Sequence, residues 1–263
     1  MNAQQHKDAA DLLWDAWLAG RKMAALPAAL RPSTRAEGYA IQSFLEQRSP
    51  TPLFGWKIAA TSAAGQQHIG VDGPIAGRLL TERVHRSGGD MSVAGNAMLV
   101  AEPEFAFRMG RDLEPRADAY SVQEVLDAVA SLHPAIEVPD SRYEDFAHVG
   151  AAQLIADNAC AHRFVLGETT TVNWREIDLI EHRVAGEVAG KLEREGKGAN
   201  VLGDPRVALT WLANELSRLS IPLRAGHVIT TGTCMAPLAV AAGDRVTADF
   251  GSIGKVSVSF TSD

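Results

Sequence analysis

Two glutamates separated by one proline lie in an otherwise apolar segment. The stretch LVAEPEFAFRM, residues 99–109, carries Glu102 and Glu104 on either side of Pro103. Successive side chains of a β-strand point to opposite faces, so a strand here places both carboxylates on one face and the apolar residues on the other. Two carboxylates about 5–7 Å apart repel by about 3 kcal/mol at an effective dielectric constant near 20. The pair therefore needs a counter-charge, which a divalent cation supplies.

A third acid has a similar setting. Glu137 lies between Ile136 and Val138 in HPAIEVPDSRYEDF, residues 133–146, where an unpaired carboxylate would be unfavourable. Three carboxylates suit Mg²⁺ or Mn²⁺, hard cations that prefer oxygen ligands and keep exchangeable water. The competing interpretation puts Glu102 and Glu104 on the solvated face of an amphipathic edge strand. A proline between them predicts a sheet edge or a bulge, because it donates no ladder hydrogen bond.

A lysine and a histidine complete the set of candidate acid-base groups. Lys57 lies in the apolar run GWKIAATS, residues 55–62, and apolar surroundings lower the pKa of a lysine towards the range useful in proton transfer. Alternatively, only its stem is covered and its amino group reaches water. His68, in GQQHIG, is interpreted as an ordinary helix-end or surface histidine.

The elements that must position these groups begin with helices. Residues 6–19 form an apolar stripe at helical spacing, and Thr34 with Glu37 begins a second helix that runs to about Arg48. Ser121 begins a third helix with Glu124 three residues later, and Asp204 begins a fourth with Pro205 in its first turn. The apolar residues expected on the third helix are Val122, Val125, Val129 and Leu132.

Strands dominate the rest of the chain. We expect them at residues 99–109, 134–139, 162–167, 177–190, 227–232, 244–250 and 255–260. The last two form a hairpin around a Gly-Ser-Ile-Gly turn, whereas KLEREGKG, residues 191–198, is expected to be a solvated loop. Few strands are separated by helices, which disfavours a doubly wound parallel sheet. The prediction is an α+β protein with a helical N-terminal part, residues 1–52, and a β-rich, barrel-like or rolled-sheet body, residues 53–263, in one compact unit.

Composition narrows the class of protein. The 263 residues carry a net charge of −7 with scattered basic residues, which argues against a nucleic-acid surface. Two isolated cysteines indicate neither a disulfide framework nor a zinc site. Acidic residues interrupt the N-terminus and no apolar run reaches 18 residues, so we expect a cytoplasmic protein without a membrane span.

Several motifs in their order along the chain resemble one known family. They are GWKIAATS, GVDGPIAGRL, AEPEFAF, PAIEVPDSR, IADNACAHRFVLG, LGDPRVALTWLANEL and TTGTCMAPLAVAAGDRVTADF. Together they resemble the 2-keto-4-pentenoate hydratase and 4-oxalocrotonate decarboxylase family of the fumarylacetoacetase C-terminal-domain superfamily. The resemblance spans essentially the whole chain. It implies that Glu102, Glu104 and Glu137 bind Mg²⁺ (or Mn²⁺) and that Lys57 is catalytic. It also implies a small 2-oxo acid substrate from aromatic catabolism and a homo-oligomer, with a paralogous pathway enzyme as a possible partner.

Further residues are candidates for binding the substrate. They are Asp72, Asp157, Cys160, Thr231 and Thr233. A turn stabilised by side chains explains the segment around Asp157 equally well, and a strand end with a tight glycine explains TTGT. Two positions depart from the pattern of the hydratases. Ile75 stands where those enzymes have a second aspartate that assists water addition, and Cys160 replaces a serine.

Four functions remain open on the sequence. The favoured one is hydration of 2-hydroxypenta-2,4-dienoate to 4-hydroxy-2-oxopentanoate, and the first alternative is decarboxylation of 2-oxo-3-hexenedioate. A carbon–carbon hydrolase of acylpyruvates is less favoured, because the sequence contains no Asn-Tyr-x-x-His-x-x-Glu segment. The last alternative is a non-catalytic subunit that binds a metabolite, against which the presence of Lys57 and all three glutamates counts.

Overall fold

A strongly curved sheet, a second smaller sheet and peripheral helices build the molecule. The computed structural model describes residues 1–263. The helices are α1 Ala3–Leu18, α2 Arg35–Gln42, α3 Leu45–Arg48, α4 Ala63–His68, α5 Val122–Asp127, α6 Ala151–Ala156 and α7 Pro205–Arg218. The strands are β1 Leu53–Ala59, β2 Ile75–Leu80, β3 Val84–Arg86, β4 Asp90–Ser92, β5 Val100–Met109, β6 Val129–Val138, β7 Arg163–Leu166, β8 Arg183–Val188, β9 Leu192–Lys197, β10 Val228–Thr233, β11 Leu238–Ala239, β12 Arg245–Asp249 and β13 Lys255–Thr261.

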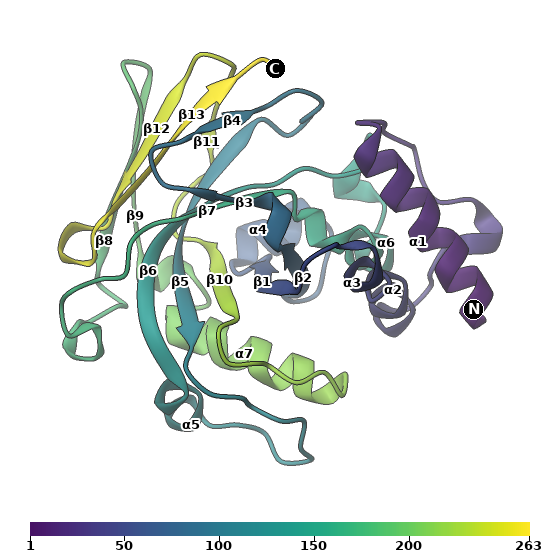
Figure 1. The fold of residues 1–263 in the computed structure, drawn as a ribbon, viewed down its shortest axis with the longest axis horizontal. Coiled ribbons are helices and arrows are strands. Elements are labelled where there is room, and N and C mark those ends of the chain that lie inside the picture. Colours follow the sequence, from purple (N-terminus) through teal and green to yellow (C-terminus); the bar gives the residue numbers. More distant parts are fainter.

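The larger sheet curls around the site. Its order is β2-β1-β10-β5-β6-β7-β3, with β11 also paired to β5, and it is mostly antiparallel. The second sheet has the order β4-β13-β12-β8-β9. Figure 1 shows the two sheets together as a curled half-barrel, with α7 across one end and the N-terminal helices to one side. The predicted α+β class with a rolled sheet is confirmed, and the division at residue 52 stays a prediction.

Capping residues fix the helix starts as expected. The side chain of Thr34 accepts a hydrogen bond from the amide of Glu37 at 3.2 Å, and Ser121 forms a full capping box with Glu124. The apolar stripe of α1 buries Ala10, Leu13 and Trp17. The second predicted helix is broken at Ser43–Phe44 into α2 and α3, which together end at Arg48 as expected.

Two expectations are wrong, and a third holds in only one of its two alternatives. The third helix ends at Asp127, and Val129 and Leu132 belong to β6, where pairing with β5 replaces helical packing. KLEREGKG is not a loop, because β9 forms a hairpin with β8 whose mostly exposed, polar side chains hide the alternation of a strand. Pro103 does not lie at an edge, since β5 runs between β10 and β6. The bulge alternative agrees with the register shift between Thr230 and Thr233 in the neighbouring strand.

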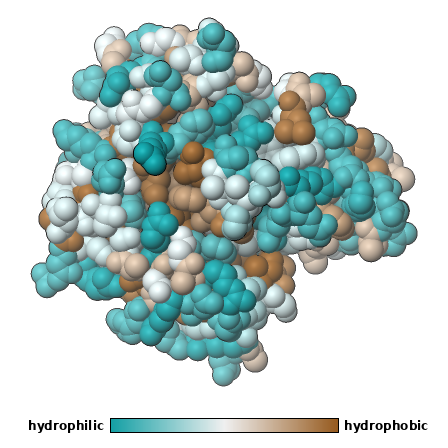
Figure 2. All heavy atoms as spheres, viewed as in Figure 1, coloured by the Kyte–Doolittle hydropathy of each residue, from teal (hydrophilic) through white to brown (hydrophobic).

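The visible surface is largely hydrophilic (Figure 2). Hydrophilic residues predominate on the face shown in Figure 2, and hydrophobic ones gather mainly in a hollow near its middle. No helix combines the length and the apolar character needed to span a membrane.

Candidate metal centre and active site

Strand register brings the three acids together. Glu102 and Glu104 lie two residues apart on β5 and share a face, and Glu137 on β6 stands directly opposite Glu102. One carboxylate oxygen from each residue lies within 4.8 Å of the other two. Glu104 and Glu137 are fully buried and Glu102 is partly exposed, so the amphipathic-edge interpretation is wrong.

The bulge in β10 fixes the orientation of Glu104. Its Oε2 accepts a hydrogen bond from the backbone N–H of Gly232 at 2.7 Å and another from the hydroxyl of Thr230. Its Oε1, like Oε1 of Glu137, is buried without a hydrogen-bond partner. Unsatisfied buried carboxylate oxygens are unfavourable, and a cation bound between these residues would satisfy both atoms.

The donor set fits a hard divalent cation. Two oxygens on opposite sides of Mg²⁺ are about 4.2 Å apart, because each bond is about 2.1 Å long, and larger cations tolerate wider spacing. The observed separation of up to 4.8 Å lies close to this range. All three donors are carboxylates, which Mg²⁺ and Mn²⁺ prefer over the softer metals. Three ligands leave coordination positions for water or a substrate.

The charges of the cluster are unfavourable without a cation. Burial, reinforced by the charge of Glu137, raises the pKa of Glu102 to about 7. Burial and the two neighbouring carboxylates raise the pKa of Glu104 well above its ordinary value. Burial also raises the pKa of Glu137, although the Lys57 ammonium opposes this shift. A divalent cation reverses these shifts, because it stabilises the ionised form of each ligand.

We therefore expect the metal-free protein to lose stability as the pH rises. A carboxyl group whose pKa is higher in the folded state than in the unfolded state stabilises the folded state when the pH is below the unfolded-state pKa. This stabilisation is lost as the pH rises through the folded-state pKa. For Glu102 this loss of stability is expected between pH 4.5 and about pH 7. Urea unfolding at about pH 5 and about pH 7.5, with chelator or with Mg²⁺, measures the effect. Metal-free stability that rises across this window would contradict the expectation.

Lys57 faces the acid cluster from β1. Its Nζ lies 2.9 Å from Oε2 of Glu137 and donates a hydrogen bond to the carbonyl oxygen of Ala159 at 3.0 Å. Burial alone would lower the pKa of Lys57, but the three carboxylates, Glu137 first, raise it above its ordinary value. The predicted lowering of this pKa is wrong, because the apolar sequence neighbours of Lys57 did not reveal the acids on other strands.

A left-handed segment supplies the carbonyl that binds Lys57. Asn158, Ala159 and Cys160 have φ values of 57°, 51° and 61°. Each such non-glycine residue costs about 1–3 kcal/mol, so the surroundings must hold the segment in place. The Asn158 amide does so, accepting from the Arg78 N–H at 2.6 Å and donating to its carbonyl at 2.9 Å. Gly77 makes room, because a Cβ there would lie 2.3 Å from the Asn158 carbonyl oxygen.

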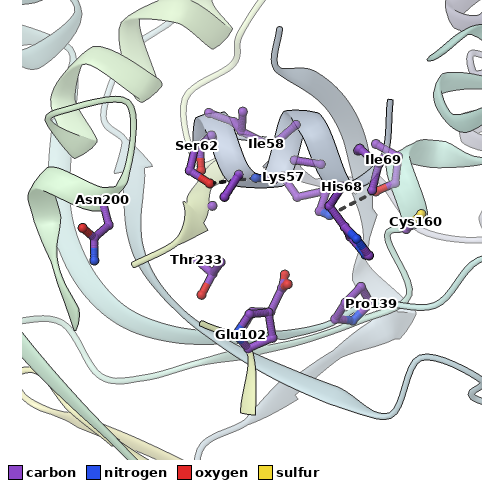
Figure 3. Close-up of a pocket in the computed structure, with 18 of the residues that line it drawn as sticks. Lys57, Ile58, Ser62, His68, Ile69, Glu102, Pro139, Cys160, Asn200 and Thr233 are labelled. Carbon is purple, nitrogen blue, oxygen red and sulfur yellow. Dashed lines mark hydrogen bonds between the residues drawn. The ribbon is translucent and has the colours of Figure 1, made fainter. Parts of the chain in front are cut away.

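Glu102, the outermost acid of the cluster, lines a cavity of about 970 Å³. Its lining is mostly apolar, with Lys57 and Glu102 among the few charged groups. Figure 3 shows the Glu102 carboxylate and the His68 ring pointing into the same space. The other polar side chains of the lining are Thr61, Ser62, Cys160, Asn200 and Thr233. A cavity of this size and lining has room for a small organic acid.

The predicted substrate-binding residues have different settings. Cys160 and Thr233 line the cavity. Asp72 lies at the surface, where its side chain is 88% exposed and pairs with Arg35. Asp157 is buried against Arg142 and Ser141 and supports the left-handed segment, whereas the Thr231 hydroxyl donates to the carbonyl of Phe105 at 3.0 Å. Asp72, Asp157 and Thr231 are not among the cavity-lining residues.

Sequence reasoning missed three contributions to the site. The TTGT segment was expected to offer its hydroxyls and N–H groups to the substrate carboxylate or to form a strand end, yet Thr230 and Gly232 hold the carboxylate of Glu104. His68 is exposed at the end of α4, as expected, but it also lines the cavity. The spacing of His68 from Lys57 could not reveal this, because the turn between β1 and α4 decides which way the helix points.

The fold and the acid cluster agree with a defined family. Residues 48–261 match the family described as Fumarylacetoacetate (FAA) hydrolase C-terminal, and the chain belongs to this family. The chain is similar over its whole length to a 2-keto-4-pentenoate hydratase of Paraburkholderia xenovorans (strain LB400), with 35% identity over 269 residues and coverage of 100% of this chain and 97% of that protein.

Two further relatives extend the comparison. A 2-hydroxyhexa-2,4-dienoate hydratase of Comamonas testosteroni is 32% identical over 219 residues, 82% of this chain and 81% of that protein. The solved structure of 4-oxalocrotonate decarboxylase from Pseudomonas putida G7, complexed with magnesium and adipate, superimposes with a TM-score of 0.90 at 28% identity, covering 99% of this chain and 98% of that one. The chain is thus a 2-keto-4-pentenoate hydratase-like member of its family.

Proposed function

We propose that the protein is a divalent-metal-dependent hydro-lyase of aromatic catabolism that converts 2-hydroxypenta-2,4-dienoate, or a close homologue, to the 4-hydroxy-2-oxo acid. The observation that carries the proposal is the convergence of three carboxylates beside a largely apolar cavity that Glu102 lines. The 35% identity to a 2-keto-4-pentenoate hydratase over the full chain supports the choice of reaction.

Glu102, Glu104 and Glu137 are the proposed ligands of Mg²⁺ or Mn²⁺. Two unpartnered carboxylate oxygens and the raised pKa values of the cluster support this assignment, and the related decarboxylase was solved with magnesium. When bound, the cation supplies Lewis-acid stabilisation of the negative charge that develops on the 2-oxygen of the substrate.

Lys57 is the proposed catalytic residue at the reacting end of the substrate. Its ion pair with Glu137 and its hydrogen bond to Ala159 fix the position of the ammonium group. A protonated lysine in this place stabilises enolate charge and delivers a proton to C3. The apolar walls of the cavity exclude water from the rest of the dienoate, and Cys160 and Thr233 are available for contacts with it.

Decarboxylation of 2-oxo-3-hexenedioate is the second candidate. Buried Ile75 lines the cavity where the hydratase pattern has an acid, and the decarboxylase structure superimposes on nearly the whole chain. However, that substrate carries a second carboxylate, and Lys57 and His68 are the only basic side chains in the lining. Lys57 already pairs with Glu137. A monocarboxylic dienoate therefore fits the cavity better.

We also propose a homo-oligomer in solution. Leu12 and Leu18 on α1 are 40% and 60% exposed, and contact with another copy would cover them. The proposal also places the protein in the cytoplasm and includes a complex with a paralogous enzyme of the same pathway.

Ultraviolet absorbance tests the reaction directly. The protein is stripped with chelator, reloaded with Mg²⁺ and mixed with 2-hydroxypenta-2,4-dienoate, and we expect rapid loss of the diene absorbance only in the reloaded sample. A parallel assay measures carbon dioxide release from 2-oxo-3-hexenedioate. Carbon dioxide release without dienoate hydration would replace the hydratase with the decarboxylase. Inactivity of the metal-loaded protein towards both compounds would refute the proposed function.

A further inference from the structure

Four titratable side chains line the cavity. They are Lys57, His68, Glu102 and Cys160. Hydration of a dienoate requires protons to move at two separate places, because the terminal carbon C5 gains a proton and water loses one as it adds to C4. These carbons lie beyond the 2-oxo end of the substrate. A group on the cavity wall must serve them.

Three of the four side chains are unsuited to this task. Glu102 is a proposed cation ligand. The Lys57 ammonium is held between Glu137 and the Ala159 carbonyl, at the end of the cavity where the three glutamates lie. Burial raises the pKa of the Cys160 thiol to about 12, so this thiol keeps its proton at neutral pH. Ile75, at the position where the hydratase pattern has an acid, cannot exchange protons at all.

His68 approaches the cavity from a different wall. It is the last residue of α4, and its ring points into the space that the Glu102 carboxylate also faces (Figure 3). The ring of Phe146 packs against its edge, with 5.9 Å between ring centroids and 74° between planes. This contact limits the orientations available to the imidazole. An imidazole ring can both donate and accept a proton through its ring nitrogens, as both steps require.

We propose that His68 is the acid-base residue for the distal carbons C4 and C5 of the substrate, a role that rests on the proposed hydratase function. The His68 imidazolium donates a proton to C5 as the 2-hydroxyl proton leaves to solvent and the 2-oxo group forms. The neutral imidazole then accepts a proton from the water that adds to C4. C3 gains a proton delivered by Lys57, which is reprotonated from solvent. Atoms and charges balance, and His68 ends the cycle protonated.

The principal test compares His68→Gln with a matched histidine control. His148 also lies at the end of a short helical turn near Phe146, but its side chain is 81% exposed and is not part of the cavity lining. We expect His68→Gln to lower kcat by about 10²–10⁴-fold with little change in KM or in Mn²⁺ affinity. His148→Gln should retain the kcat of the unmodified protein.

A second measurement separates chemistry from structure. His68 is exposed, so added imidazole can enter the space that a truncated side chain leaves. We expect imidazole to restore turnover of His68→Ala in a concentration-dependent way and to have no effect on the unmodified protein. Incorporation of deuterium at C5 in heavy water should fall in His68→Gln and recover in His68→Ala with imidazole.

The outcomes distinguish this inference from the proposed function. If the unmodified protein hydrates the dienoate and His68→Gln does so with the same kcat, the role of His68 is refuted while the hydratase stands. If His68→Ala loses turnover and added imidazole does not restore it, the acid-base role of His68 is also refuted. If the unmodified, metal-loaded protein fails to hydrate any dienoate, the proposed function itself fails.

Discussion

Replacing Glu104 with glutamine is expected to weaken Mg²⁺ or Mn²⁺ binding by more than about 100-fold and to reduce turnover at limiting metal by a similar factor. Changes to groups that only orient a ligand already lower metal affinity by about 10–100-fold, so loss of a ligand's own charge should exceed this. The amide oxygen of glutamine can still accept from Thr230 and Gly232, which keeps the local backbone in place. The metal-free fold should therefore be retained.

The same substitution has a second signature in the metal-free protein. Glu104 is one of three buried, mutually repelling carboxylates, and the neutral amide removes its share of that repulsion. The metal-free variant should be at least as stable as the unmodified protein at neutral pH, and its stability should fall less as the pH rises.

Calorimetric titration of Mn²⁺ and urea unfolding with and without metal measure these effects. Glu187→Gln is the matched control, because Glu187 is an exposed glutamate on β8 outside the cavity lining. Unchanged Mn²⁺ affinity in Glu104→Gln, or full activity in the presence of chelator, would remove the basis for a metal centre at these residues.

Local patterns predicted one part of this site well. The shared face of Glu102 and Glu104 follows from the two-residue period of a strand, which needs no knowledge of the rest of the fold. The capping box of Ser121 with Glu124 and the terminal hairpin are local in the same sense, and the structure contains both. Glu137 was suspected because it interrupts an apolar run, although its position opposite Glu102 depends on a strand register that the sequence does not specify.

Other features depend on contacts between distant segments. Lys57 looked isolated among apolar residues, yet acids from two other strands decide its pKa. Val129 and Leu132 continued a helical pattern, and pairing with β5 made them part of a strand instead. Asp72 belonged to a conspicuous motif but lies at the surface beside Arg35. In each case a partner far along the chain sets the outcome.

The left-handed segment shows a further limit of local inference. Asn, Ala and Cys are not glycine, and nothing in their order predicts three consecutive residues with positive φ. The conformation is held by Arg78, on β2, and by the absence of a side chain at Gly77. It directs the Ala159 carbonyl towards Lys57. Backbone strain of this kind can be recognised only after the fold has brought these parts together.

Replacing Lys57 with methionine should preserve metal binding and reduce turnover at saturating metal, whereas Glu104→Gln should weaken metal binding itself. Methionine has a similar shape and no charge, so Glu137 loses its ion-pair partner and becomes fully available to a cation. Mn²⁺ affinity should be retained or increased, because the ammonium group no longer competes for the same carboxylate. Turnover should fall by about 10²–10⁴-fold, since no proton can be delivered at the enolate end of the substrate.

Saturating metal is required for this comparison, because Lys57→Met leaves Glu137 without a counter-charge in the metal-free protein and should destabilise it. Calorimetric titration of Mn²⁺, followed by measurement of kcat at saturating metal and substrate, separates binding from chemistry. Lys255→Met, which removes an exposed lysine paired with Asp249, is the control and should keep full activity. Metal-loaded Lys57→Met with normal kcat would exclude Lys57 from proton transfer. Loss of metal binding in this variant would instead mean that Lys57 orients Glu137 and does not compete with the cation.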